Sequence, residues 1–370
     1  MMKFRKASAV LTVALTLGAS AATGLAMELK YNLFQPPRTL EGQVLQQAFA
    51  DIDKQTNGAV KFKLFAGGQL LSGPGTLQGI KDGVVDAGFI VPSLNLGQLK
   101  RIAIIPDLLP WAPNSYAAAA AAMDTILASC ESCKKEQADL NIWFLGGIGP
   151  TSWNIMCSKP VSNLAEFKGR RVRVTGASAT RMIRALGGVA VQLPPPEIGP
   201  ALSGGQIDCA VGPNAWLADY SLWDTVKQVI ALDLGVYHGL GLFVTNRDSF
   251  AKLTPEQRKT YLDLALKYLV VGTDRYAEQQ KEVRETANKR GIQFWTPTPD
   301  FENALNKFRE TDLPNVVADF KARGTPDAQQ VVDTHMANLK KWNEFVAKNG
   351  HSEEVLVKAM RDQIYSKAKF

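Results

Sequence analysis

The sequence predicts an α/β protein of two lobes, with an open sheet in each lobe, a cleft between them and a long helix that bridges both. Three observations carry this prediction. Short β-like runs alternate with helical patterns in two separate parts of the chain. The length of 370 residues is enough for two domains of ordinary size. One helical pattern in the second half is longer than a single small lobe.

The chain begins with basic residues, then an apolar run, then a stretch of small residues that ends at Ala26. This order is typical of a secretory signal peptide, so we expect export and cleavage after Ala26. A membrane anchor is the alternative. The apolar run over residues 7–17 is, however, shorter than the roughly 20 residues that a bilayer span needs.

Removal of residues 1–26 from the 370 leaves 344 residues, and loss of three basic side chains lowers the formal net charge from +7 to +4. We expect residues 27–150 to form mainly lobe 1 and residues 151–245 mainly lobe 2. Residues 246–370 are expected to supply the long bridging helix and C-terminal helices that pack on both lobes. No dense block of Lys and Arg remains, so a nucleic-acid partner is not expected, and the modest positive charge favours a small anionic ligand.

The first half contains three β-like runs separated by two helical patterns. They are a strand at 29–34, a helix at 40–54, a strand at 59–65, a helix at 77–83 and a strand at 87–91. A βαβαβ order makes a parallel sheet with right-handed crossovers the default.

A second α/β pattern follows. It comprises strands at 142–146, 171–175 and 207–211 and helices at 177–186 and 197–203. Ligands of open α/β sheets bind at the carboxyl ends of the strands. The cleft is therefore expected at the loops 35–38, 92–95, 176–178 and 212–216.

The long helix has a clear start signal, with Thr254 as N-cap, Pro255 at the first helical position and Gln257 three residues after the cap. The helical pattern stops at Gly291, so the helix is about 36 residues and roughly 54 Å long. We expect it to be continuous or gently bent, with a break near Gly272 as the alternative.

Four cysteines would meet an oxidising compartment after export, where thiols pair. They are Cys130, Cys133, Cys157 and Cys209. Three pairings are possible, and the sequence does not choose among them. Disulfides are favoured over free buried thiols, and a redox or zinc role is least favoured. The three histidines are scattered, so no metal-ligand spacing is present and no metal or cofactor is expected.

The strand at 171–175 carries two arginines on one face, Arg171 and Arg173, with Val172 and Val174 on the other. A guanidinium held on a strand can bind a carboxylate through two parallel hydrogen bonds. The alternative is a solvated strand face. Arg173 is the main candidate for a ligand contact, whereas Arg171 is expected to be a surface charge.

Five segments in this order resemble one known family. They read TNGAVKFKLFAGGQL (56–70), GIKDGVVDAGFIVPS (79–93), FKGRRVRV (167–174), ALSGGQIDCAVGP (201–213) and VYHGLGLFVTNRDSFAKLTPEQR (236–258). The chain resembles the extracytoplasmic, DctP-like solute-binding subunits of tripartite ATP-independent periplasmic (TRAP) transporters.

The resemblance implies a two-lobed periplasmic binding protein that is not an enzyme. Such a protein captures an organic acid by its carboxylate and delivers it to a small and a large membrane subunit. The alternative is a binding protein that serves an ATP-driven importer or a sensor. A two-lobed α/β enzyme is the least favoured, because the sequence shows no nucleophile elbow, catalytic carboxylate motif or cofactor fingerprint.

The resemblance also implies site residues. Arg173 matches the arginine that forms a two-pronged salt bridge with the substrate carboxylate in this family. Lys159 is the nearest match to a second arginine, Gly212 stands where many members have asparagine, and Asn214 is a candidate for the missing amide. These departures weigh against a small dicarboxylate as the ligand.

Further candidates come from positions near the expected cleft. Lobe 1 is expected to contribute Gln35, Pro92 and Ser93, which follow predicted strands. Aromatic side chains there would favour a ligand with an apolar or ring-shaped body, although each can also be core packing. The aromatic candidates are Trp216, Trp153, Tyr237 and Phe34. His238 is a candidate hydrogen-bond partner of a carboxylate or a loop cap.

Overall fold

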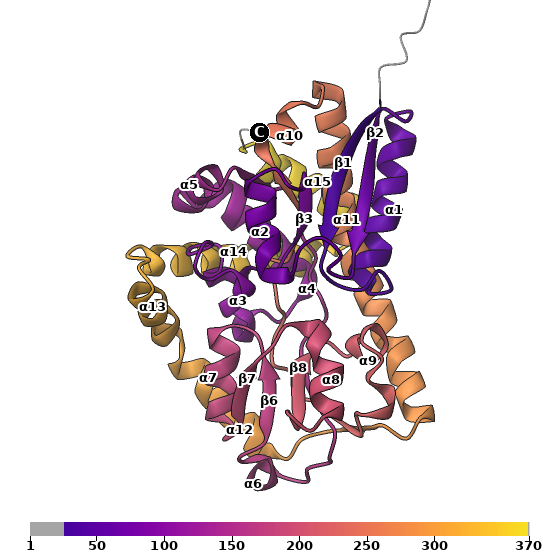
Figure 1. The fold of residues 1–370 in the computed structure, drawn as a ribbon. Helices are drawn as coiled ribbons and strands as arrows, with labels where there is room; N and C mark the ends of the chain where they lie inside the picture. Colours follow the sequence, from indigo (N-terminus) through magenta and orange to yellow (C-terminus); the bar gives the residue numbers. More distant parts are fainter. Residues whose placement is uncertain (1–25, 369) are drawn as a thin grey trace, which may run out of the picture.

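The computed structural model describes residues 26–368 and 370, and contains two separate open sheets, one in each lobe (Figure 1). All but the last residue of the segment interpreted as a signal peptide lies outside the described residues. The helices of the described residues include none that is both long and apolar enough to cross a bilayer.

The sheet of the first lobe has five strands in the order β2-β1-β3-β10-β4. These are β2 (Val60–Ala66), β1 (Met27–Leu33), β3 (Ala87–Ile90), β10 (Gly241–Asn246) and β4 (Ile142–Phe144). Strands β1, β2 and β3 are parallel, as expected. The expectation of a wholly parallel sheet is wrong, because β10 returns from the second lobe and runs antiparallel to both β3 and β4.

The sheet of the second lobe has six strands in the order β11-β9-β5-β8-β6-β7. These are β11 (Gln293–Trp295), β9 (Gln228–Ile230), β5 (Asn154–Cys157), β8 (Cys209–Gly212), β6 (Arg171–Val174) and β7 (Val189–Gln192). Strand β5 lies antiparallel between β8 and β9, so this sheet is also mixed.

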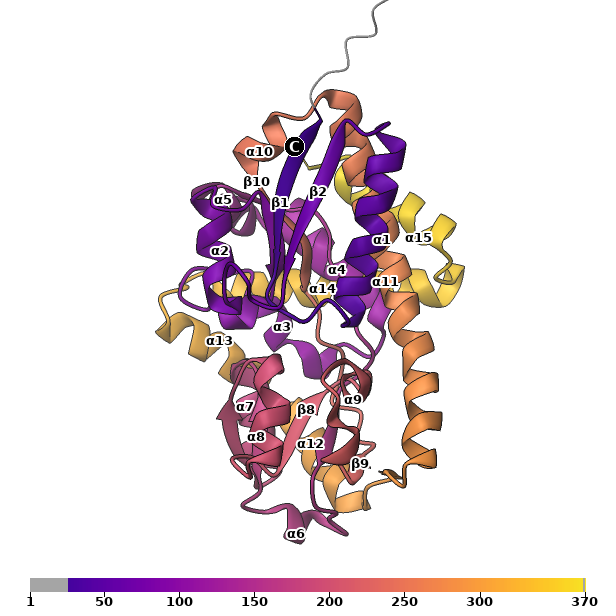
Figure 2. The same cartoon turned by 45° about the vertical axis from the view of Figure 1, so that its right-hand side comes forward.

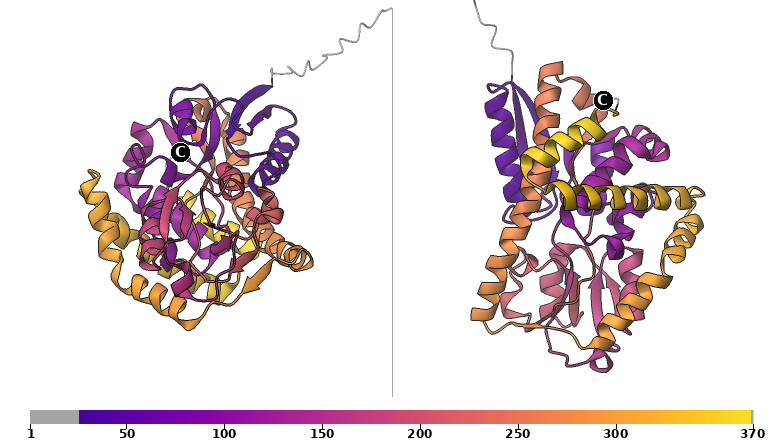
Figure 3. Two further views of the ribbon diagram at one scale, coloured as in Figure 1. Left: turned by 60° about the horizontal axis from the view of Figure 1, so that its bottom comes forward. Right: turned by 180° about the vertical axis from the view of Figure 1, so that it is seen from behind.

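Fifteen α-helices of the described residues cover the sheets and connect the lobes. They are α1 (Leu40–Gln55), α2 (Gly73–Lys81), α3 (Ile104–Asp107), α4 (Ser115–Asp124), α5 (Glu131–Asp139), α6 (Leu164–Phe167), α7 (Ala177–Ala185), α8 (Ile198–Ser203), α9 (Trp216–Asp219), α10 (Arg247–Ala251), α11 (Pro255–Lys289), α12 (Pro299–Thr311), α13 (Leu313–Ala322), α14 (Ala328–Asn349) and α15 (Glu353–Met360). Seen from behind, the chain returns from the second lobe through α12 and α13, and α14 crosses behind the first sheet (Figure 3).

Helix α11 is one continuous helix of 35 residues that runs along both lobes (Figure 2). The Thr254 hydroxyl accepts a hydrogen bond from the amide of Gln257, and the Gln257 side chain accepts one from the amide of Thr254, which completes a capping box. Gly291, at φ +74°, follows the C-terminal end. At 1.5 Å per residue the helix is about 52 Å long, which is enough to span both lobes.

The four cysteines form two disulfides, Cys130–Cys133 and Cys157–Cys209. The first lies at the start of α5. The second joins the directly paired positions of β5 and β8 in the second sheet. One of the three pairings allowed by the sequence is therefore selected by strand register.

Gly272 lies in the middle of α11 without breaking it. A Cβ atom at this position would lie 2.6 Å from Cγ2 of the buried Ile148, so the glycine allows the helix to approach the loop before β5 closely. The contact explains why a residue of poor helix propensity occupies a buried helical position.

We expect Gly272→Ala to lower the free energy of unfolding by about 1 to 3 kcal/mol, because crowding outweighs the helix propensity gained. Urea denaturation of the chain from residue 27 measures it. In an Ile148→Ala background the same substitution should be neutral or stabilising. Stabilisation by Gly272→Ala in the parent protein would contradict the close approach described here.

Candidate ligand-binding site

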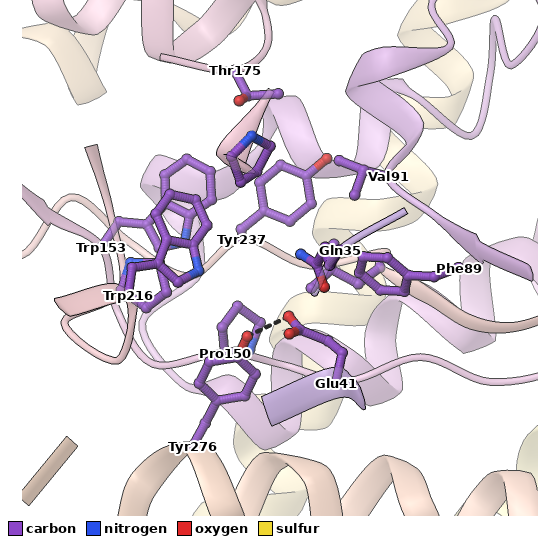
Figure 4. A pocket seen from close by; sticks show the side chains of 13 residues that line it. Gln35, Glu41, Phe89, Val91, Pro150, Trp153, Thr175, Trp216, Tyr237 and Tyr276 are labelled. Carbon is purple, nitrogen blue, oxygen red and sulfur yellow. Dashed lines mark hydrogen bonds between the residues drawn. The ribbon is translucent and has the colours of Figure 1, made fainter. Parts of the chain in front are cut away.

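A small cavity of about 30 Å³ lies between the lobes beside α11 (Figure 4). Its walls are largely aromatic and apolar, and its polar lining groups are few. The rings are those of Phe89, Trp153, Trp216, Tyr237 and Tyr276. The polar lining side chains are Gln35, Glu41 and Thr175. Several of these residues follow or end strands of the two sheets, at the edge where open α/β sheets bind ligands.

Arg173, on β6, is fully buried just behind this cavity. Its Nε donates to the carbonyl of Leu193 at 2.8 Å, Nη1 donates to the carbonyl of Val211 at 3.2 Å, and Nη2 donates to the hydroxyl of Thr175. The guanidinium carbon lies 5.2 Å from the centre of the Trp216 ring, in cation–π contact. Thr175 and Trp216 both line the cavity, so they link the guanidinium to it.

The charge of Arg173 is not matched by a protein carboxylate. No acidic side chain of the described residues lies within salt-bridge distance of its guanidinium, whereas Arg171 on the same strand pairs with Asp208 at 3.0 Å. Burial lowers the pKa of Arg173 to about 9, because the charged form is desolvated. A guanidinium has five N–H groups, and the three hydrogen bonds to protein oxygens leave one hydrogen on each terminal nitrogen for another acceptor.

Trp216 occupies its position because residue 212 has no side chain. A Cβ atom on Gly212 would lie 2.2 Å from the indole ring, so any larger residue would displace Trp216. The indole ring, buried at the start of α9, therefore takes the space of the asparagine that the family resemblance implies. Beside it, Trp153 stacks on Tyr237 with ring centres 5.0 Å apart and planes within 10°.

The other end of the cavity is acidic. Glu41, in the first turn of α1, is 2% exposed and accepts a hydrogen bond from the Tyr276 hydroxyl of α11. In Figure 4, Glu41 and Tyr276 lie on the opposite side of the aromatic rings from Thr175. Burial raises the pKa of Glu41. Next to it, Gln35 donates from Nε2 to the Tyr220 hydroxyl at 3.0 Å.

Several predicted residues line the cavity or support its walls. Gln35, Trp153, Trp216 and Tyr237 line it directly. The Ser93 hydroxyl lies 2.7 Å from the Tyr237 hydroxyl and so helps to hold that ring. Three more predicted residues are buried close to the lining without forming it. Asn214 accepts a hydrogen bond on its Oδ1 from Asn154 Nδ2 at 3.2 Å, and Phe34 stacks on Phe89. Pro92 follows the lining residue Val91.

Two predicted residues lie away from the cavity. Lys159 is exposed beyond Cys157, at the end of β5 opposite Asn154, because β5 runs antiparallel to β8. His238 is fully buried, and its Nε2 lies 2.8 Å from Nε2 of His335 on α14. Burial lowers the pKa of His238 to about 4, so it is neutral at physiological pH. Neither side chain takes part in the site as the structure builds it.

The sequence-based interpretation did not include Glu41, Thr175 or Tyr276. Thr175 had a usable signal, because it lies two residues after Arg173 and so on the same strand face. Glu41 had none, since an acidic residue in the first helical turn ordinarily serves to stabilise the helix dipole. Tyr276 enters the site only because α11 passes beside the cavity.

Asp219 lies close to this acidic end and makes the stability of the fold depend on pH. Its Oδ1 accepts a hydrogen bond from Gln279 Nε2 at 3.0 Å, and burial, reinforced by the charge of Glu41, raises its pKa to about 8. In the folded protein Asp219 therefore keeps a proton that it releases at lower pH in the unfolded chain. Its contribution to stability is complete at a pH below its pKa in the unfolded chain. That contribution is lost as the pH rises through its pKa in the folded protein.

Between about pH 4 and about pH 8, we expect the free energy of unfolding of the parent protein to fall by a few kcal/mol more than that of Asp219→Asn. The reason is that each unit of difference between the folded and unfolded pKa of Asp219 corresponds to about 1.4 kcal/mol. Urea denaturation across this range measures the difference. Asp224→Asn, at a side chain that is 96% exposed, is the control and should follow the parent. Identical pH profiles for the parent and Asp219→Asn would contradict the assignment.

Similar solved structures share this fold. A TRAP periplasmic solute-binding protein from Desulfovibrio salexigens with bound orotic acid superposes with a TM-score of 0.73 at 20% identity, covering 85% of this chain and 99% of that one. One from Rhodoferax ferrireducens with copurified benzoate gives 0.72 at 21% identity, with 86% and 99% covered. DctP7 of Bordetella pertussis, an extracytoplasmic solute receptor binding pyroglutamic acid, gives 0.69 at 23% identity, with 84% and 100% covered.

Sequence comparison gives the same family. A solute-binding protein from Albidiferax ferrireducens is 22% identical over 308 residues, which cover 81% of this chain and 77% of that protein. The family model for DctP, described as bacterial extracellular solute-binding protein, family 7, matches residues 32–318. This range includes most elements of both lobes and all of the residues that line the cavity. The chain belongs to family 7 of the bacterial extracellular solute-binding proteins, the DctP family.

Proposed function

We propose that this solute-binding protein captures a small organic acid by pairing its carboxylate with Arg173. The observation that carries the proposal is a fully buried guanidinium, just behind a cavity, with no carboxylate partner among the described residues. A carboxylate can use the two remaining N–H groups, one on each terminal nitrogen, in a planar two-pronged contact. Such an anion would offset the desolvation of the buried charge.

The aromatic walls favour an acid with a ring. Trp153, Trp216 and Tyr237 present flat apolar surfaces, which suit a ring better than a short aliphatic chain. Nε1 of Trp153 is buried without a hydrogen-bond acceptor and is available to an oxygen of the ligand. Support also comes from the similar structures with orotic acid, benzoate and pyroglutamic acid, each of which is a ring-bearing acid.

Entry of such a ligand requires the lobes to separate. The cavity of about 30 Å³ is far smaller than an organic acid needs, and Arg173 has no exposed surface. Opening would break the hydrogen bond between Gln35 and Tyr220. It would also break the two hydrogen bonds that Asp107 of α3 accepts from the backbone amides of Ala177 and Ser178 at the start of α7. Closure would bring the lobes together around the ligand and enclose a larger space than the unliganded cavity.

The closed form would act in the periplasm and deliver its acid to a small and a large TRAP membrane subunit. Membership of an extracellular solute-binding family supports export, and the similarity to TRAP receptors supports this class of partner. The gene neighbourhood tests the delivery step. Genes for the two membrane subunits beside this one are expected, whereas genes for an ATPase subunit would point to ATP-driven import.

We expect Arg173→Gln to weaken carboxylate binding by about 2 to 5 kcal/mol, because a desolvated ion pair is lost. A thermal-shift screen of the chain from residue 27 against benzoate, mandelate, orotate and pyroglutamate identifies a binding acid, and calorimetry then measures its affinity. The unliganded variant should remain folded, since the substitution removes an unpaired buried charge.

Arg171→Gln is the matched control. It removes the same charge from the same strand, but its side chain is exposed and pairs with Asp208, so binding should stay close to the parent value. Parent-like affinity in Arg173→Gln would overturn the proposal, as would equal losses in both variants.

A further inference from the structure

The acidic end of the cavity carries hydrogen-bond acceptors that lack donors. Glu41 is 2% exposed. Its Oε1 accepts a hydrogen bond from the Tyr276 hydroxyl, and its Oε2 has no hydrogen-bond partner among the described residues. Gln35 is also 2% exposed, and its side-chain oxygen also lacks a hydrogen-bond donor. Its amide nitrogen donates to Tyr220. Both side chains line the cavity.

None of the described neighbours of Glu41 donates a hydrogen bond to its Oε2. Gln279 Oε1 is buried without a donor as well, so it adds a further acceptor. The nearby basic side chain of Arg38 donates from Nε to the backbone carbonyl of Asp219 at 3.1 Å, not to a carboxylate. A buried polar group without a partner is unfavourable. The acidic end is therefore matched by a group that donates hydrogen bonds.

This acidic end lies opposite the arginine end. Thr175, which receives a hydrogen bond from Arg173, appears on one side of Figure 4, and Glu41 with Tyr276 appears on the other, with the rings of Trp216 and Tyr237 between them. The two ends also belong to different parts of the fold. Arg173 is on β6 of the second lobe, whereas Glu41 is on α1 of the first.

We propose that the ligand is an organic acid that also carries a hydrogen-bond donor, an ammonium or a hydroxyl group, across its ring from the carboxylate, and that Glu41 binds this donor. This inference rests on the proposed function, since it takes the carboxylate to be at Arg173. It also excludes a class of ligand. A second carboxylate at this end would face the Glu41 carboxylate, so dicarboxylates are rejected.

Benzoate and its substituted forms test the proposal, because they share one ring and one carboxylate. The probes are benzoate, the hydroxybenzoates, the aminomethylbenzoates and the benzenedicarboxylates, measured by calorimetry on the chain from residue 27. At least one donor-bearing isomer should bind at least about tenfold more tightly than benzoate. The dicarboxylates should bind more weakly than benzoate. The hydroxyl and aminomethyl series distinguish a neutral donor from a cationic one.

Glu41→Gln should change the specificity of the site. The new amide can still accept from Tyr276 with its oxygen, but it then presents an NH₂ group to the ligand. The preference for the donor-bearing acid should fall by about tenfold, and the dicarboxylates should gain affinity. Glu136→Gln is the matched control. That carboxylate is also buried, but it accepts from the amides of Arg101 and Ile102 and does not line the cavity.

The outcomes separate this inference from the proposed function. If Arg173→Gln abolishes binding but donor-bearing acids bind no better than benzoate, or Glu41→Gln leaves specificity unchanged, the Glu41 assignment is wrong and the proposed function stands. If neither this series nor the acids of the thermal-shift screen bind, or if Arg173→Gln binds as the parent does, both the Glu41 assignment and the proposed function are wrong. Stabilisation by sodium or calcium ions alone that disappears in Glu41→Gln would show an inorganic cation at this end and overturn the donor proposal.

Discussion

The buried charge of Arg173 is the constraint on which the site depends. Moving a cation out of water costs several kcal/mol, and three neutral oxygens from Leu193, Val211 and Thr175 replace its hydration only in part. A buried lysine can escape such a penalty by losing its proton, but a guanidinium whose pKa falls to about 9 still carries its charge at neutral pH. The remaining penalty is available to an anion as binding energy.

The same guanidinium organises the rings around it. Trp216 lies against Arg173 on one side and takes the volume left free by Gly212. Trp153 packs near Trp216 and stacks on Tyr237, whose hydroxyl is held by Ser93. One missing side chain thus gives an indole surface where the family resemblance implies a polar amide. The change shifts the expected ligand from a short polar acid toward an acid with a ring.

The fold and the site differ in how far the sequence predicted them. Strong local signals predicted the βαβαβ order of the first lobe, the capping box of α11 and the strand that carries Arg173. Strands β5, β7, β9, β10 and β11 were not predicted, because they owe their pairing to segments distant in the sequence. Lys159 was expected at the cavity from the family resemblance but lies at the opposite end of β5. Glu41 was not expected at all.

The two polar ends of the cavity also relate selectivity to lobe closure. A carboxylate at Arg173 contacts the second lobe, and a donor at Glu41 contacts the first lobe and, through Tyr276, the bridging helix α11. An acid with only a carboxylate makes its polar contacts on one lobe, and closure adds only contacts with apolar walls of the first lobe such as Phe89. An acid with both groups gains its second contact only when the lobes meet, so it shifts the population toward the closed form. The group that makes a ligand specific would then also be the group that drives closure.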